Sequence, residues 1–120
     1  MNTFGQRIRD LRAAKSYSLR TLAPLVGVGF TYLSKVECGK LDFGEFPSAN
    51  LIHRLASALD GDEEELLLLS HRIPESISKR IFEQPEAFRE LAQCDSSTIE
   101  RVLENLRLEK SASERAHKPR

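Results

Sequence analysis

The side chains that most often carry catalytic or metal chemistry are few in this chain and widely scattered. Its 120 residues include three histidines and two cysteines, and none shows the Cys-x2-Cys or His-x3-His spacing that is typical of a metal site. His53 is instead expected to be a half-buried helix residue. No nucleophile, base and orienting group form a recognisable set, and no glycine-rich phosphate loop is present. We therefore expect no catalytic residue, no metal and no cofactor.

The distribution of charge points to a different chemistry, the binding of a polyanion. The formal net charge is zero, with 18 basic and 18 acidic residues. Residues 1–40 contain seven basic and two acidic side chains, a net charge of +5, whereas residues 41–65 contain one basic and seven acidic side chains, a net charge of −6. Such asymmetry favours a basic binding face near the N-terminus. Ordinary variation of surface charge is the alternative interpretation.

Composition narrows the class of protein. With 40% hydrophobic and 30% charged residues, the chain can bury a modest core. No stretch approaches the ~18 apolar residues that a membrane span needs, and the polar first eight residues do not resemble a signal peptide. Two cysteines are too few for a disulfide scaffold. We expect a cytoplasmic protein without membrane association.

Apolar residues recur every three or four positions along nearly the whole chain, which predicts helices and no strands. Candidate N-caps are Ser18, Ser48 and Asp62, and the last of these has a glutamate three residues later, as in a capping box. Glycines follow the second and third helices as stop signals. The second, third and fifth helices are expected at about residues 19–26, 30–38 and 63–70. The first begins near Phe4 and ends before Lys15, and the fourth follows Ser48.

The remaining residues predict three further helices and a tail. Pro74 and Pro85 each open a short helix, and Ser97 with Glu100 forms a capping box for a longer one. Beyond residue 110 the sequence is polar and is expected to fray. We therefore divide the chain into an N-terminal domain at residues 1–72, a C-terminal helical segment at 73–110 and a polar tail at 111–120.

Residues 19–38 combine a short helix, a three-residue turn and a second helix, an arrangement that allows the second helix to enter the major groove of B-DNA. The segments FGQRIRDLRAAKSYSLRTLAPLVGV, FTYLSKVECGK and LIHRLASALDGDEEELLLL resemble the helix-turn-helix domain of the Cro/CI-type (XRE) transcriptional regulators. The resemblance includes five elements in order. It implies an all-α, five-helix lambda-repressor-like domain whose partner is double-stranded DNA.

The resemblance also implies roles for individual residues. Base-reading positions are Phe30, Thr31, Tyr32, Ser34 and Lys35, and phosphate contacts are implied for Tyr17, Ser18, Arg20 and Lys40. Arg12 is implied to pair with Glu37 and so to fix the recognition helix. Phe30 and Tyr32 are unusual readers, for which packing on the turn is the alternative. For each basic residue the alternative is an ordinary solvated surface.

Two features depart from the family pattern. Pro24 falls inside the second helix, where it removes a backbone donor and predicts a kink or an early stop. Asp42 and Glu45 place acid in a loop where related repressors often carry basic residues. We expect this loop to point away from DNA or to contact a protein partner.

The last predicted helix carries an apolar stripe formed by Ile99, Val102, Leu103 and Leu106. These side chains must be covered, either by the N-terminal domain or by the same helix of a second subunit. We favour a dimerisation segment and therefore a homodimer.

The sequence as a whole predicts a transcriptional regulator, most simply a dimeric repressor that reads a palindromic operator through the major groove. The alternative is a protein-interaction module that keeps the helix-turn-helix fold, such as an antitoxin or a protease-controlled partner protein. A regulatory protein is a further possible partner.

Overall fold

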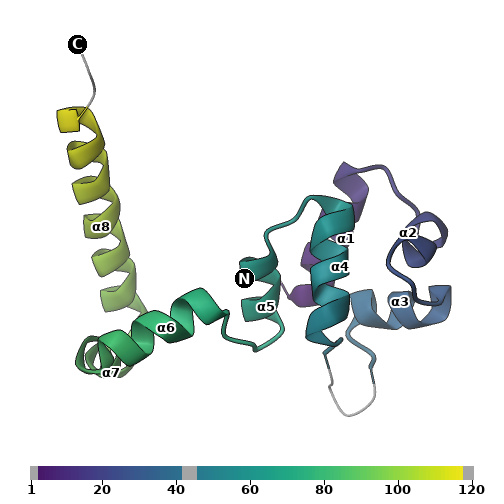
Figure 1. Cartoon of the computed structure of the whole chain (residues 1–120), viewed down its shortest axis with the longest axis horizontal. Coiled ribbons are helices and arrows are strands. Elements are labelled where there is room, and N and C mark those ends of the chain that lie inside the picture. Colours follow the sequence, from purple (N-terminus) through teal and green to yellow (C-terminus); the bar gives the residue numbers. More distant parts are fainter. Residues whose placement is uncertain (1–2, 42–45, 118–120) are drawn as a thin grey trace. The chain divides into compact units, whose positions relative to one another are not determined.

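A computed structural model of the chain describes residues 3–41 and 46–117, and every regular element within these ranges is an α-helix (Figure 1). The prediction of an all-α fold is therefore confirmed. The helices are α1 (Phe4–Ala14), α2 (Leu19–Leu25), α3 (Phe30–Cys38), α4 (Ala49–Leu59), α5 (Glu63–Leu69), α6 (Glu75–Glu83), α7 (Pro85–Gln93) and α8 (Ser96–His117).

The chain divides into two units, residues 1–75 and residues 76–120. The first contains α1 to α5, in which α1 contacts α3, α4 and α5, while α2 contacts α3 (Figure 1). The second contains α7, α8 and all of α6 except its first residue. None of the helices in the described ranges is both long and apolar enough to cross a membrane.

Side-chain caps fix the beginnings of the helices in the first unit. The side chains of Ser18, Ser48 and Asp62 each accept a hydrogen bond from the backbone N–H three residues later, as the sequence predicted. At α1, Thr3 and Gln6 form a reciprocal capping box that the sequence analysis did not identify. Gly39 ends α3 in the left-handed conformation, with φ of 67°.

The second helix ends within one residue of its predicted bound, and Pro24 lies inside it. It ends at Leu25, one residue after the proline, and Gly27 then adopts a positive φ of 72°. Proline lacks the N–H that would bond to the Arg20 carbonyl, yet the Val26 N–H still donates to the Leu22 carbonyl at 3.2 Å, so the helix ends where Gly27 turns the chain. The turn to α3 follows directly.

One apolar core holds the five helices of the first unit together. Phe46 adds an edge-to-face contact to Phe4, with ring centroids 6.3 Å apart. The buried apolar residues of this core are Phe4, Ile8, Leu22, Ala23, Val26, Leu33, Val36, Leu51, Ile52, Leu55, Ala56, Leu59 and Leu66.

Two expectations for α8 were wrong. Its first turn is capped by Asp95, whose Oδ1 accepts from the backbone N–H of Thr98 at 2.8 Å, so Ser97 lies inside the helix rather than at its cap. Aspartate is as good an N-cap as serine and occurs earlier in the chain. The helix also continues to His117 through residues expected to fray, because this segment contains alanine, glutamate and arginine and no helix breaker.

Candidate nucleic-acid interface

The third helix has one buried face and one exposed face. Leu33 and Val36 are buried in the core. On the other side, Phe30 is 41% exposed and Tyr32 is 39% exposed. Thr31 and Lys35 are also exposed, whereas Ser34, the remaining residue expected to read bases, is half-buried. Four of the five expected base-reading residues are therefore exposed.

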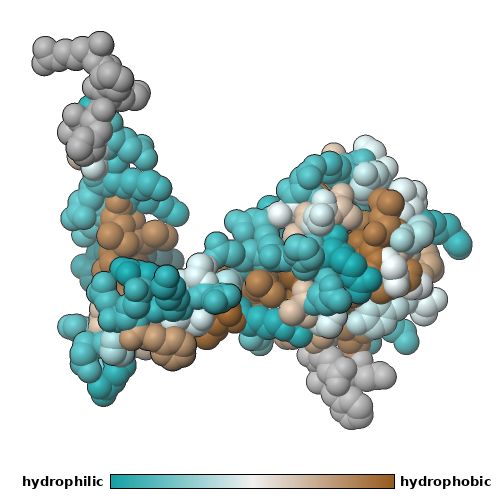
Figure 2. All heavy atoms as spheres, in the orientation of Figure 1, coloured by the Kyte–Doolittle hydropathy of each residue, from teal (hydrophilic) through white to brown (hydrophobic). Residues whose placement is uncertain are grey.

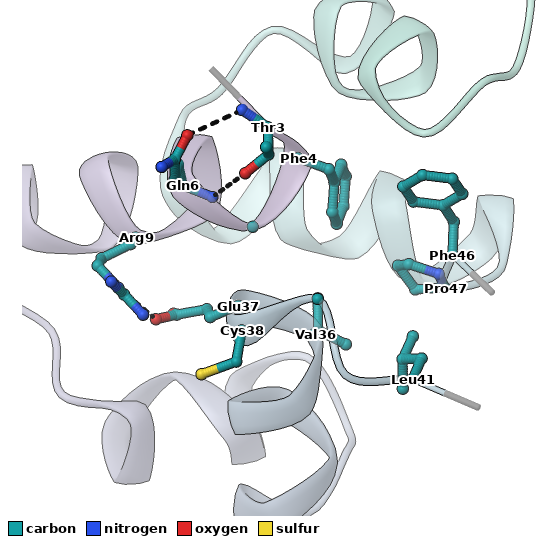
Figure 3. Close-up of a pocket in the computed structure, with 12 residues that line it drawn as sticks. Thr3, Phe4, Gln6, Arg9, Val36, Glu37, Cys38, Leu41, Phe46 and Pro47 are labelled. Atoms are coloured by element: carbon teal, nitrogen blue, oxygen red, sulfur yellow. Dashed lines mark hydrogen bonds and ion pairs between the residues drawn. The ribbon is translucent and has the colours of Figure 1, made fainter. Parts of the chain in front are cut away.

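Gly5 allows α1 to lie directly against the end of α3. A Cβ atom placed on Gly5 would lie 2.2 Å from the carbonyl oxygen of Glu37, well inside van der Waals contact. Figure 3 shows this junction, where Arg9 of α1 points toward Glu37 of α3, while Thr3 and Gln6 bond to each other. The position of α3 therefore depends on a residue without a side chain.

A buried ion pair strengthens the same junction. Arg12 Nε donates to Glu37 Oε2 at 2.7 Å, and Arg12 Nη2 donates to Glu37 Oε1 at 3.0 Å. The Glu37 side chain is only 2% exposed, and the Arg12 side chain is 19% exposed. Arg9 adds a looser contact, with its Nε 3.5 Å from Glu37 Oε1. The structure thus brings together the two residues that the family resemblance pairs.

Arg12 also connects α3 to the turn before α2. Its Nη1 donates to the backbone carbonyl of Tyr17 at 2.9 Å. The hydrogen bond to Glu37 raises the pKa of the Arg12 guanidinium above its ordinary value, so this side chain is charged throughout the physiological range. One guanidinium therefore fixes both sides of the helix-turn-helix.

The residues expected to contact phosphate are placed differently from one another. Arg20 and Lys40 are exposed, Tyr17 is half-buried, and Ser18 is exposed but its Oγ accepts from the backbone N–H of Thr21 at 3.0 Å. The hydroxyls of Ser18 and Thr21 also lie 2.9 Å apart.

Arg20 and Phe30 form a contact that the sequence did not suggest. The Arg20 guanidinium carbon lies over the Phe30 ring, 4.7 Å from its centroid. This distance is within the range of a cation–π interaction. It connects the second residue of α2 to the first residue of α3.

Other residues identified from the sequence lie away from this surface. His53 is not half-buried as expected: its side chain is 69% exposed and forms an ion pair or hydrogen bond with Glu63. It lies on the polar side of α4, where the acidic first turn of α5 attracts it. Asp42 and Glu45 lie outside the described residues. No group of three or more potential metal ligands occurs within the ranges that the structure describes.

The sequence analysis missed Gly5, Arg9 and Thr21. Gly5 could have been suspected, since a glycine in the first turn of an amphipathic helix lowers helix propensity without an evident local reason. Arg9 and Thr21 gave no comparable signal. Their contacts depend on the tertiary arrangement.

In the second unit, the stripe expected at a dimer interface is largely exposed. Ile99, Leu103 and Leu106 are each more than 40% exposed, and Val102 is half-buried. Figure 2 shows apolar atoms gathered along part of α8.

Comparisons with known proteins agree with this architecture. A family model described as a helix-turn-helix domain matches residues 3–69. The uncharacterized HTH-type transcriptional regulator RghRB of Bacillus subtilis (strain 168) is 28% identical over 106 residues, which are 88% of this chain and 73% of that protein.

Two solved structures are also similar. The SinR protein/SinI protein complex matches at 26% identity with a TM-score of 0.51, covering 91% of this chain and 99% of that chain. The restriction-modification controller protein C.AhdI from Aeromonas hydrophila matches at 44% identity with a TM-score of 0.46, covering 52% of this chain and 89% of that chain.

The helix-turn-helix model covers more than half of the chain, and α1 to α5 lie within the residues that it matches. The protein therefore belongs to the XRE-type helix-turn-helix family of transcriptional regulators.

Proposed function

We propose that this protein is a repressor that binds a palindromic operator as a homodimer and reads it through the major groove. The observation that carries the proposal is the two-sided character of α3. Its exposed face holds Phe30, Thr31, Tyr32 and Lys35, while Glu37 on its other side is held by Arg12. A helix held rigidly by its inner face, with polar and aromatic groups outward, suits insertion into a groove of about one helix diameter.

Thr31, Tyr32 and Lys35 each carry a group that can contact a base or a phosphate. The Thr31 hydroxyl can hydrogen-bond a base while its methyl group contacts a thymine methyl, and Lys35 can reach O6 and N7 of guanine. Tyr32 can contact a thymine methyl through its ring or a phosphate through its hydroxyl. Tyr17, Ser18, Arg20 and Lys40 supply the phosphate contacts that set the register in this proposal.

Dimerisation is the second part of the proposal. A single domain of this size buries too little surface for tight, specific binding, so two copies are needed. The exposed stripe at Ile99, Val102, Leu103 and Leu106 supports pairing of α8 with its copy. The polar face of α8 contains both acidic and basic residues, among them Glu100, Arg101, Glu104 and Arg107, so two copies of the helix can match opposite charges.

Selection of bound DNA from a random pool, with the full chain, tests this function. We expect a two-fold symmetric motif whose half-site centres are about 34–36 Å apart, one turn of DNA. The control is the variant Thr31→Ala/Lys35→Ala, which should enrich no motif or a weaker one. Recovery of unrelated sequences by the wild-type chain would contradict the proposal.

A second candidate is a protein-interaction module, and one observation favours it. The SinR protein/SinI protein complex contains two different proteins, and its similarity extends over 91% of this chain, hence into the second unit. A helical regulatory protein that covers the α8 stripe would compete with homodimerisation. Sedimentation of the purified chain distinguishes the two candidates. A homodimer supports the repressor, whereas a monomer that also selects no DNA motif supports the interaction module. In either case we propose that the protein acts in the cytoplasm.

A further inference from the structure

The contact between Arg20 and Phe30 places two flat side chains at the exposed edge of the helix-turn-helix. The guanidinium carbon of Arg20 lies 4.7 Å from the centroid of the Phe30 ring. Both residues are exposed, and each stands at the N-terminal end of its helix, α2 or α3. A stacked cation and ring in this position have no task in the core.

We propose that Arg20 and Phe30 act as one reading unit for two adjacent base pairs, a guanine and a neighbouring pyrimidine that carries a 5-methyl group. Arg20 contacts the guanine and Phe30 contacts the methyl group. This inference rests on the proposed DNA binding and specifies two adjacent base pairs of the operator. It assigns Arg20 to base reading and so replaces the phosphate contact that the proposed function gives to this residue; Tyr17, Ser18 and Lys40 keep their phosphate contacts.

The free donors of Arg20 support the guanine assignment. Within the parts of the chain that the structure describes, its guanidinium makes no hydrogen bond or ion pair. The five N–H groups of a guanidinium lie in one plane, and stacking on a ring leaves the edge of that plane open. An arginine edge matches the paired O6 and N7 acceptors of guanine, which is the commonest specific contact in the major groove.

The chemistry of Phe30 determines what the second base must offer. A phenyl ring has no hydrogen-bonding group, and the apolar feature at base edges in the major groove is the C5-methyl group of thymine. A 5-methylcytosine carries a methyl group at the same ring position, whereas cytosine and uracil do not. The 41% exposure of Phe30 leaves ring surface available for this contact.

The spacing of the two groups indicates neighbouring base pairs. Their separation of 4.7 Å is longer than the rise of about 3.4 Å between successive base pairs, but it is nearer to one such rise than to two. The Arg20 guanidinium and the Phe30 ring can therefore contact two adjacent base pairs while they remain stacked. Each half-site should therefore contain a thymine, or a 5-methylcytosine, next to a guanine.

The experiment uses the full chain and duplexes derived from its selected site. At the pyrimidine, the duplexes carry thymine, 5-methylcytosine, uracil or cytosine, each with its complementary base. We expect thymine and 5-methylcytosine to bind alike, and uracil and cytosine to bind about fourfold more weakly, the effect of one buried methyl group. Replacing the guanine by 7-deazaguanine, which lacks N7 and keeps base pairing, should weaken binding about tenfold.

Matched variants connect these effects to the two residues. Phe30→Ala should abolish the preference for a methylated pyrimidine and keep the sensitivity to 7-deazaguanine. Arg20→Ala removes the guanidinium edge, so it should bind the guanine and 7-deazaguanine duplexes alike. Lys40→Ala is the control, and it should weaken all duplexes equally. Circular dichroism checks that each variant is folded.

Two outcomes overturn the inference and leave the proposed function intact. One is a selected motif that contains no such step. The other is a set of variants in which Arg20→Ala and Phe30→Ala show the same discrimination as the wild type, as phosphate contacts would give. Failure to select any motif contradicts the proposed function itself.

Discussion

At the scale of single residues, Glu37 connects the core of the first unit to the surface of α3. Its carboxylate is almost fully buried and contacts two arginines of α1. Arg12 is half-buried, and Arg9 is exposed. Removing two charges from water costs much of what their attraction returns, so such a pair contributes more to fixing geometry than to stabilising the fold. The orientation of α3 is the property that this pair controls.

Arg12→Ala should lower the free energy of unfolding by about 3–5 kcal/mol, because it leaves the buried Glu37 carboxylate without its main partner. The double variant Arg12→Met/Glu37→Leu should recover much of this loss. Urea denaturation measures both. Arg9→Ala is the control, with an expected loss under about 1 kcal/mol, since Arg9 is 54% exposed. Strictly additive losses for Arg12 and Glu37 would show that the two side chains act independently.

Thr31→Ala and Lys35→Ala should each reduce affinity for the selected operator by roughly 1–3 kcal/mol and relax the sequence preference. Lys40→Ala should weaken binding to every DNA to a similar extent and flatten the salt dependence, because it loses a phosphate contact. Gel shifts at several salt concentrations separate the two patterns. Wild-type affinity in both α3 variants would mean that another surface reads the DNA.

At the scale of the elements, the close approach of α1 and α3 allows a direct test. Gly5→Ala places a methyl group 2.2 Å from the Glu37 carbonyl oxygen, so the two helices must separate. Overpacking of this kind typically costs about 1–3 kcal/mol and should also weaken specific DNA binding. Gly29→Ala is the matched control for stability, because no atom lies within 4 Å of its added Cβ, and it should cost under about 1 kcal/mol. Equal losses for both glycines would contradict this explanation.

The cap of α8 predicts a dependence on pH. Hydrogen bonds from Thr98 lower the pKa of the Asp95 carboxyl below its ordinary value, so the ionised cap stabilises the folded form. This stabilisation is present above the ordinary pKa of aspartate and is lost as the pH falls through the lowered pKa. Hydrogen exchange of the first-turn amides of α8 should therefore accelerate in acid and in Asp95→Ala. Ser97→Ala should behave like the wild type; faster exchange in that variant alone would restore Ser97 as the cap.

Much of this arrangement could be predicted from local sequence, because local chemistry decides where most helices begin and end. Ser18, Ser48 and Asp62 cap their helices as expected, and α3 has the predicted bounds. The predicted N-cap of α8 was wrong because two good capping residues, Asp95 and Ser97, lie two residues apart. The Gly5 contact and the stacking of Arg20 on Phe30 depend on how distant helices meet, which periodicity and capping do not encode.

At the scale of the whole molecule, the second unit should determine the oligomeric state. Val102→Glu/Leu106→Glu places two charges in the proposed dimer surface and should yield a monomer that binds the operator far more weakly. Its first unit should stay folded. Leu108→Glu is the control, since Leu108 is exposed but lies off the stripe, and it should remain dimeric. Sedimentation and gel shift measure both properties, and an unchanged dimer in the double variant would exclude this surface.

The measurement that tests the central claim most directly is the ratio of affinities for the selected operator and for a scrambled duplex of the same composition. It is made at physiological salt with the full chain. Sequence reading by α3 predicts a ratio of at least about 10³, because specific and non-specific binding by such proteins typically differ by this factor or more. Equal affinity for the two duplexes, at every salt concentration, would contradict the account.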